Sequence, residues 1–388
     1  MKMPGWPHFD EQQIQAVVDV LSSGEVNYWT GELGRTFEKR FAEYSGCRYG
    51  VALANGTVAL ELALLARGIG PGDEVVVTPR TFLASANCAL LRGATPVFAD
   101  VDRVSQNITA ESIRKVLTPR TRAIVAVHLS GWPCEMDSIV ELARERKLHV
   151  IEDCAQAHGA TYRGRPVGSL GDVAAFSFCQ DKIMTTGGEG GMLVTDDEAV
   201  WRKVWEYKDH GKSYDAVYNR EHVPGFRWLH ESLGTNYRMT EMQAALGLVQ
   251  LDKVGDWVDR RRANAARLSE GLAPLAGLRL AEPPEHIRHS YYRYYANVRP
   301  ERLRDGWHRD RIMNEIVERG VPCFSGICGE VYLEKVFQRE LDTPQDRLPV
   351  ARELGETSLA FLVHPTLGPE QMDHTCHVVN EVLKEATA

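Results

Sequence analysis

Short, nearly continuous runs of apolar residues recur along the chain between residues 50 and 195. They are rich in β-branched residues, and segments with helical spacing of apolar positions separate most of them. This is typical of strands that helices cover on both faces. The predicted strands are 74–78, 95–101, 122–129, 148–153, 173–178 and 191–195, and the predicted helices are 57–67, 81–92, 109–117 and 137–147. The alternation predicts an α/β fold with a mostly parallel central sheet.

The last two predicted strands of this region are joined differently from the others. A glycine-rich segment without a helix lies between 173–178 and 191–195. Parallel neighbours need a long crossover connection, which is usually a helix. We therefore expect one of these two strands to run antiparallel to the rest of the sheet.

The pattern changes after residue 240. Residues 241–272 carry apolar side chains at spacings of three and four, which predicts one long helix. The segments that follow are a proline-containing patch at 280–286, an aromatic strand at 290–298 and helices at 308–319 and 367–386. We therefore predict a large domain at 1–250 and a smaller C-terminal α/β domain at 251–388.

Composition restricts the classes of partner. The chain has 388 residues, of which 44% are hydrophobic and 25% charged, and its formal net charge is -8. Acidic and basic residues are interspersed, so the concentrated basic face of a nucleic-acid-binding protein is not expected. No window approaches the roughly 18 uninterrupted apolar residues of a membrane span. The first residues also lack the apolar core of a signal peptide.

Eight cysteines are scattered along the chain without a C-x-x-C pair. This favours reduced thiols in a cytoplasmic protein over a disulfide framework. His374, Cys376 and His377 lie close together, but no second ligand cluster at standard spacing accompanies them. We therefore expect no metal site.

The stretch LANGTVALELALLARG (53–68) has the features of an anion-binding site. An apolar strand ends at Asn55 and Gly56, and a helix opens at Thr57. Free N–H groups and the positive end of the helix dipole favour an anion there, and Gly56 allows close approach to the backbone. The alternative is a capped, buried helix with nothing bound.

The stretch LHVIEDCAQAHGA (148–160) places Asp153 where an apolar strand stops, with Gln156 in the following turn. Open α/β sheets bind ligands at the carboxyl ends of their strands. A carboxylate at that position can accept a hydrogen bond from a protonated ring nitrogen. The alternative is that Asp153 only caps a helix.

The stretch SFCQDKIMTTGGEGG (177–191) holds Lys182 between an apolar strand and a glycine cluster. The glycines follow the lysine, so the spacing of a phosphate-binding P-loop is absent, and the dinucleotide pattern G-x-G-x-x-G is incomplete. Two interpretations of this stretch remain: a surface turn, or a lysine that forms a covalent bond.

The stretch GTNYRMTEMQAALG (234–247) places Asn236 and Arg238 in a loop just before the long helix, and Thr240 caps that helix.

Together these stretches describe one chemistry. An anion site, a carboxylate for a ring nitrogen and a lysine for an aldehyde are what pyridoxal phosphate requires. The lysine forms an imine with the aldehyde. The carboxylate keeps the pyridine nitrogen protonated, so that the ring accepts electrons from a carbanion.

The stretches EDCAQAHGA, SFCQDKIMTTGGEGG and NYRMTEMQAALGLVQL resemble those of the DegT family of sugar-nucleotide aminotransferases, which are fold type I pyridoxal phosphate enzymes. The resemblance runs from about residue 20 to 265. It implies a fold type I aminotransferase, with a large cofactor-binding domain at 1–250, a small domain at 251–388 and a homodimer whose active sites lie at the subunit interface.

The resemblance also implies a role for individual residues. Lys182 would bond to the cofactor and act as the base, and Asp153 would pair with the ring nitrogen. The other implied cofactor contacts are Gln156 at the 3-oxygen, Phe82 on the ring face, Gly56, Thr57 and Ser177 at the phosphate, and Asn236 at the phosphate of the neighbouring subunit's cofactor. The segments that line the sugar-nucleotide site in the family contain Tyr28, Thr30, His210 and Arg238.

The implied reaction transfers an amino group from L-glutamate to a nucleotide-linked keto-deoxy sugar, at C4 by family analogy with C3 next. The product would serve glycan, lipopolysaccharide or secondary-metabolite biosynthesis.

The chain departs from the family's sequence pattern at two places. Cys-Gln-Asp precedes Lys182 where many members have an aromatic residue and a proline, and 321–337 lacks the family's His-Tyr-x-Pro pattern. The second departure resembles the related aminohydroxybenzoate synthases. That activity and a non-catalytic, cofactor-binding regulatory protein are the alternatives.

Overall fold

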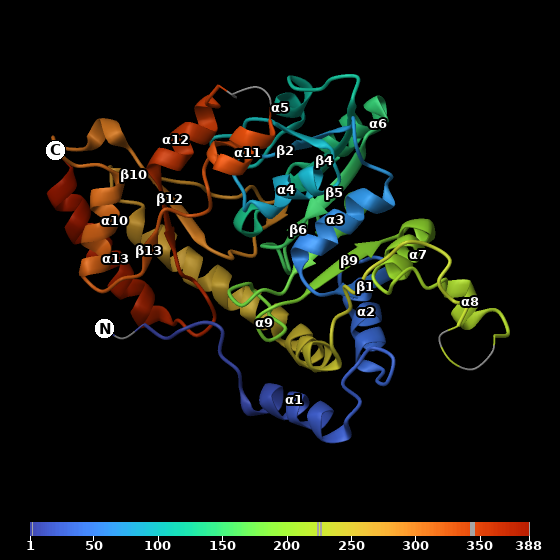
Figure 1. The fold of residues 1–388 in the computed structure, drawn as a ribbon. Helices are drawn as coiled ribbons and strands as arrows, with labels where there is room; N and C mark the ends of the chain where they lie inside the picture. The colour runs from blue at the N-terminus through green and yellow to red at the C-terminus, as the bar shows by residue number, and fades with distance from the viewer. Residues whose placement is uncertain (2, 223–224, 226, 342–345, 388) are drawn as a thin grey trace.

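The computed structural model of the chain describes residues 1, 3–222, 225, 227–341 and 346–387. Its largest unit is a seven-stranded sheet with the order β1-β9-β8-β5-β4-β2-β3 (Figure 1). The strands are β1 (Tyr49–Leu53), β2 (Glu74–Val77), β3 (Thr95–Phe98), β4 (Thr121–Val127), β5 (His149–Asp153), β8 (Val173–Ser177) and β9 (Gly191–Thr195). Neighbours from β8 to β3 are parallel, whereas β9 is antiparallel to both β1 and β8. The mostly parallel sheet and the antiparallel strand are both confirmed.

Helices cover both faces of this sheet, as the apolar strands require. One face packs against α2 (Leu33–Tyr44), α6 (Met136–Arg146) and part of α9 (Glu241–Leu272). The other face packs against α3 (Gly56–Ala66), α4 (Ala84–Leu91) and α7 (Glu198–Tyr207). Alternate residues of a strand divide between the two cores, since Val76 faces the first and Val75 and Val77 face the second.

A second, four-stranded antiparallel sheet is built from residues after α9, in the order β10-β12-β14-β13. Its strands are β10 (Leu278–Leu280), β12 (Tyr294–Val298), β13 (Cys323–Phe324) and β14 (Ser358–Phe361), and its helices include α10 (Arg309–Glu318) and α13 (Pro369–Ala386). Val258 of α9 belongs to the core of the large sheet, and Leu268 belongs to that of the small one. The predicted boundary at residue 250 thus lies inside α9, which runs from one sheet to the other (Figure 1).

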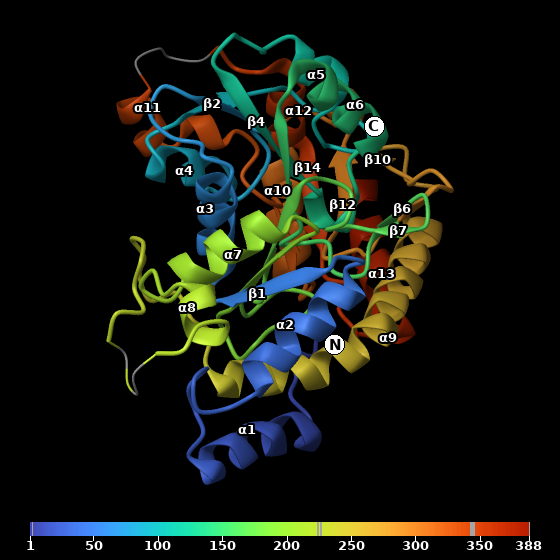
Figure 2. The same ribbon diagram turned by 90° about the vertical axis from the view of Figure 1, so that its right-hand side faces the viewer.

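The remaining elements connect or flank these two sheets. They are α1 (Glu11–Ser23), α5 (Ala110–Arg114), β6 (Thr161–Tyr162), β7 (Arg165–Pro166), α8 (Tyr214–Tyr218), β11 (Ile287–Arg288), α11 (Lys335–Glu340) and α12 (Pro349–Thr357). Helix α1 packs along α9 at the edge of the molecule (Figure 2). None of the helices in the described ranges is both long and apolar enough to cross a membrane.

Several predicted segments differ from the observed ones. The strand expected at 290–298 begins at Tyr294, and the helix expected at 109–117 ends at Arg114. The helix expected at 81–92 begins only at Ala84, because Thr81 and Phe82 form part of the turn that leads from β2 to the helix. The strand expected at 95–101 ends at Phe98, since the carboxylate of Asp100 instead accepts hydrogen bonds from the N–H groups of Val350 and Ala351 at the start of α12.

His158 is part of the core rather than of a ligand site. Its ring lies among Phe41, Phe176 and Phe178, with centroids 5.4–6.4 Å apart. Both ring nitrogens are buried without a hydrogen-bond partner among the described residues. Burial lowers the pKa of His158 from 6.5 to about 3, so the ring is neutral in the folded protein.

We expect His158→Phe to weaken the dependence of stability on acid. The ring gains a proton at pH 6.5 and below when the chain unfolds, so its contribution is complete above pH 6.5 and is lost as the pH falls toward about 3. In the wild type, uptake of this proton on unfolding lowers the free energy of unfolding by about 1.4 kcal/mol for each pH unit of acidification between pH 6 and 4. This contribution to the slope should be absent from His158→Phe. Urea denaturation at fixed protein concentration measures it. His377→Gln, on an exposed ring of α13, is the control, and an unchanged slope in His158→Phe would contradict the assignment.

Candidate active site

A cavity of about 750 Å³ opens at the carboxyl ends of the central parallel strands. It brings together seven of the predicted site residues from four separate segments of the chain. They are Gly56, Thr57, Phe82, Asp153, Gln156, Ser177 and Lys182. The Phe82 side chain is 63% exposed, so one side of the cavity is open to the surface of the single chain.

Asp153 is the last residue of β5, and its carboxylate is buried. Oδ2 accepts a hydrogen bond from the Ser85 hydroxyl at 2.6 Å, and Oδ1 accepts one from the N–H of Ala155 at 3.1 Å. Burial raises the pKa of Asp153, although the Ser85 hydrogen bond acts in the opposite direction. Within the described part of the chain, no cationic side chain lies within 4 Å of this carboxylate. It therefore retains acceptor capacity for a ligand that carries a positive N–H.

Gln156 is oriented by its neighbour Ser130. The backbone N–H of Ser130 donates to Oε1 of Gln156 at 2.8 Å. The amide oxygen is thereby occupied, which leaves the Gln156 NH₂ group as a donor toward the cavity. Ser130 adopts a left-handed backbone conformation with φ of 57°, which turns its N–H toward the glutamine.

The start of α3 forms a cradle for an anion. Asn55 caps the helix by accepting the N–H of Val58 at 3.0 Å, and the first N–H groups of the helix have no partner within the helix. A Cβ on Gly56 would lie 2.7 Å from the Cβ of Ser177, so only glycine permits this close approach of helix and strand. The hydroxyls of Thr57 and Ser177 border the same part of the cavity.

Lys182 follows β8, and its side chain is 16% exposed. The amine Nζ lies 3.5 Å from Oδ1 of Asp181 and 5.0 Å from the ring centroid of Tyr292. The backbone is fixed as well, because the Lys182 carbonyl accepts the indole N–H of Trp6 at 2.8 Å. Burial alone would lower the pKa of Lys182, but Tyr292 and Asp181 outweigh it and raise that pKa above its usual value.

Five predicted residues do not line this cavity. Tyr28 is buried, where its hydroxyl donates to Glu38 at 3.0 Å and accepts from Trp205. Arg238 pairs with Asp209 at 2.5 Å. Thr30, His210 and Asn236 are exposed on the chain, and Asn236 lies beside Asp209 on the same surface as Arg238.

Sequence reasoning missed several residues that shape the cavity. Ser85 lies three residues after Phe82 and could have been found from that proximity. Ser130 and Tyr292 carry no local motif, because the fold alone brings them to Gln156 and Lys182.

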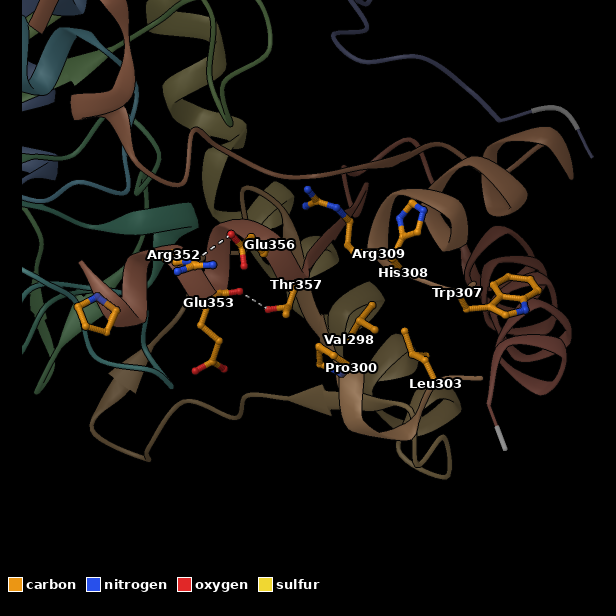
Figure 3. A pocket seen from close by; sticks show the side chains of 11 residues that line it. Val298, Pro300, Leu303, Trp307, His308, Arg309, Arg352, Glu353, Glu356 and Thr357 are labelled. Atoms are coloured by element: carbon orange, nitrogen blue, oxygen red, sulfur yellow. Dashed lines mark hydrogen bonds and ion pairs between the residues drawn. The ribbon is translucent and has the colours of Figure 1, made fainter. Parts of the chain in front are cut away.

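A second cavity, of about 350 Å³, lies beside the small sheet (Figure 3). Val298, Leu303 and Trp307 form its apolar part, and Arg352 and Glu356 pair with each other at its rim. There is no lysine among the described residues that line it. Lys182, the lysine for which the sequence predicts a covalent bond, lies in the larger cavity.

The residues of the larger cavity fit pyridoxal phosphate. A helix start with glycine and hydroxyl groups suits the phosphate, and the buried Asp153 carboxylate suits a protonated pyridine nitrogen. Gln156 offers a donor for the 3-oxygen. Lys182 lies in the same cavity as these groups and can reach an aldehyde there.

Known proteins resemble this chain along its whole length. The GDP-perosamine synthase of Caulobacter vibrioides is 38% identical over 387 residues and covers 97% of each chain. The UDP-N-acetyl-3-dehydro-alpha-D-glucosamine 3-aminotransferase of Acidithiobacillus ferrooxidans is 36% identical, over 92% of this chain and 91% of its own. The crystal structure of an aminotransferase from Psychrobacter cryohalolentis superposes with a TM-score of 0.97 at 54% identity, covering 99% of each chain.

Residues 7–380 match the DegT/DnrJ/EryC1/StrS aminotransferase family. This match covers nearly the whole chain and agrees with the fold. The protein belongs to the DegT/DnrJ/EryC1/StrS aminotransferase family and is a pyridoxal phosphate-dependent aminotransferase of fold type I.

Proposed function

We propose that this enzyme transfers an amino group from L-glutamate to a keto-deoxy sugar linked to a nucleoside diphosphate, with C4 as the aminated carbon. The observation that carries the proposal is the meeting of Lys182, Asp153 and the α3 helix start in one cavity. The names of two relatives, a GDP-perosamine synthase and a UDP-sugar 3-aminotransferase, support a nucleotide sugar as the acceptor.

Each predicted site residue in the cavity has a defined task in this proposal, apart from Phe82, which would lie on the ring face. Bound pyridoxal phosphate supplies an electron sink for the carbanion. Lys182 would hold the cofactor through its amine and, as a free amine, would move a proton at the substrate Cα. Asp153, held by Ser85, keeps the ring nitrogen protonated. Gln156 donates to the 3-oxygen, and Gly56, Thr57 and Ser177 bind the phosphate.

The proposal includes a homodimer that completes the site. Asn236 and His210 are exposed on the single chain, and Phe82 is exposed at the open side of the cavity. Helix α1 presents Ile14 and Leu21 to solvent on one face, at 56% exposure each. A second copy that covers these surfaces would bring Asn236 to the partner's phosphate and place Thr30, His210 and Arg238 near the substrate, with Tyr28 supporting them from within. A cytoplasmic location is part of the same proposal, since all eight cysteines are free thiols.

Lys182→Ala should abolish both the covalent link and turnover. The wild-type protein should be yellow and, after borohydride reduction, should carry the cofactor mass on the peptide that contains Lys182. Removal of the base alone costs about 10²–10⁴-fold in rate, and loss of the anchor should increase this. Absorbance, peptide mass and glutamate-dependent turnover of a keto-sugar nucleotide panel measure the effect. Lys115→Ala, at an exposed surface lysine, is the control, and a labelled peptide elsewhere would contradict the assignment.

Ser85→Ala should weaken cofactor binding, because Asp153 loses its shortest hydrogen bond. A hydrogen bond to a charged group contributes about 1.5–3 kcal/mol, which corresponds to roughly 10–100-fold in Kd. Titration of the cofactor-free protein with pyridoxal phosphate, followed by absorbance, measures this change. Ser45→Ala is a matched control, since the Ser45 hydroxyl is buried and has no hydrogen-bond partner among the residues that the structure describes. Equal affinities of Ser85→Ala and wild type would refute the role of Ser85.

Mixing two inactive variants tests the shared site. Lys182→Ala and Asn236→Ala homodimers should each have little activity. In a mixed dimer one site has both residues intact, so a randomly exchanged mixture should regain about a quarter of wild-type activity. Activity after denaturation and refolding of the mixture measures this, with each variant refolded alone as the control. No recovery, in a mixture that native mass spectrometry shows to contain mixed dimers, would place Asn236 outside the partner's site.

A further inference from the structure

The carboxylate of Asp181 lies between Lys182 and the C-terminal part of the chain. Its Oδ1 lies 3.5 Å from Nζ of Lys182. Its Oδ2 accepts a hydrogen bond from the Tyr292 hydroxyl and lies 3.5 Å from Nη2 of Arg293. Oδ2 therefore interacts with Tyr292 and Arg293, and Oδ1 interacts with Lys182.

Tyr292 and Arg293 are held in place independently of Asp181. The Tyr292 N–H donates to the Ser130 carbonyl at 2.8 Å, and the Arg293 N–H donates to the Ser130 hydroxyl at 2.9 Å. That hydroxyl donates in turn to the Arg293 carbonyl at 2.8 Å. The hydroxyl that binds Asp181 thus comes from a backbone tied to the loop after β4.

The surroundings of the Lys182 amine favour its cationic form. The aromatic ring of Tyr292 lies 5.0 Å from Nζ, within the range of a cation–π interaction. Lys182, Tyr292 and Arg293 hold the pKa of Asp181 below its ordinary value against the effect of burial, so the carboxylate is ionised. The other titratable groups lining this cavity are Asp153, Cys179, Glu189, Glu61 and Tyr237.

We propose that Asp181 is a positioning residue that holds the amine of Lys182 beside Tyr292 whenever the amine is not bonded to the cofactor. The inference rests on the proposed role of Lys182 as covalent anchor and base. Asp181 stabilises the ammonium form, and Arg293 opposes it by neutralising the same carboxylate. The balance between the two sets the pH at which Lys182 becomes a free base.

The test is a direct titration of the Lys182 amine in the full-length, cofactor-free protein. Reductive methylation with ¹³C-formaldehyde labels the lysines, and the signal that Lys182→Ala lacks is followed by NMR against pH. Asp181→Asn should lower the pKa of this amine by about one unit, and Arg293→Gln should raise it. Asp373→Asn, an exposed carboxylate paired with Arg267 on the small domain, should leave it unchanged.

Two further measurements separate positioning from a structural effect. Thermal melting should be the same in Asp181→Asn and wild type, and in the holoenzyme the acidic limb of the kcat profile should move to lower pH by the same amount. If Asp181→Asn does not fold, the same titration is made on two other variants. Tyr292→Phe keeps the ring but removes the donor to Asp181, and Arg293→Gln removes the cation beside the same carboxylate. Unchanged titration of Lys182 in the folded variants overturns the proposal. Because the NMR titration needs neither cofactor nor sugar, failure of the keto-sugar panel would contradict the proposed function alone.

Discussion

The buried carboxylate of Asp153 is the constraint on which the rest of the site depends. A charge in this position is costly unless it is paired and hydrogen-bonded. Ser85 and the N–H of Ala155 supply two hydrogen bonds, and burial still raises the pKa of the group. A protonated ring nitrogen would supply the missing positive donor. With such a donor bound, cofactor binding and ionisation of Asp153 would stabilise each other.

The topology of the large sheet places the other groups around this carboxylate. Strands β4, β5 and β8 are parallel neighbours, so Ser130, Asp153 and Lys182 emerge at one edge of the sheet. Strand β1 runs in the same direction as β8 because β9 is antiparallel to both. The α3 helix start therefore opens onto the same edge. The antiparallel β9 is thus part of what brings the anion cradle next to the lysine.

The sequence predicts those parts of the site whose signals are local. Gly56, Asp153 and Lys182 each lie at the end of a predicted strand or shortly after it. All three fall within about 130 residues of regular strand and helix pattern, so periodicity and spacing locate them. The partners that orient them cannot be found in this way. Ser130 reaches Gln156, and Tyr292 reaches Asp181, only through the packing of separate segments. Likewise, nothing in the local sequence distinguishes an exposed Asn236 from a buried Tyr28.

The three residues before Lys182 show why some contacts of the site cannot be predicted from the local sequence. Cys179 accepts the Lys182 N–H through its carbonyl at 3.1 Å, which is a backbone role that many side chains would permit. The Asp181 carboxylate accepts a hydrogen bond from Tyr292, which lies 111 residues away in the chain, so the local sequence does not reveal this contact. Tyr292 is bonded to Ser130, and Ser130 to Gln156. These hydrogen bonds and the ion pair of Lys182 with Asp181 therefore connect the lysine to Gln156 through the segment that leads into β12. A displacement of the segment that carries Tyr292 would therefore change the environment of Lys182 and the orientation of Gln156 together, so this part of the chain also shapes the candidate active site.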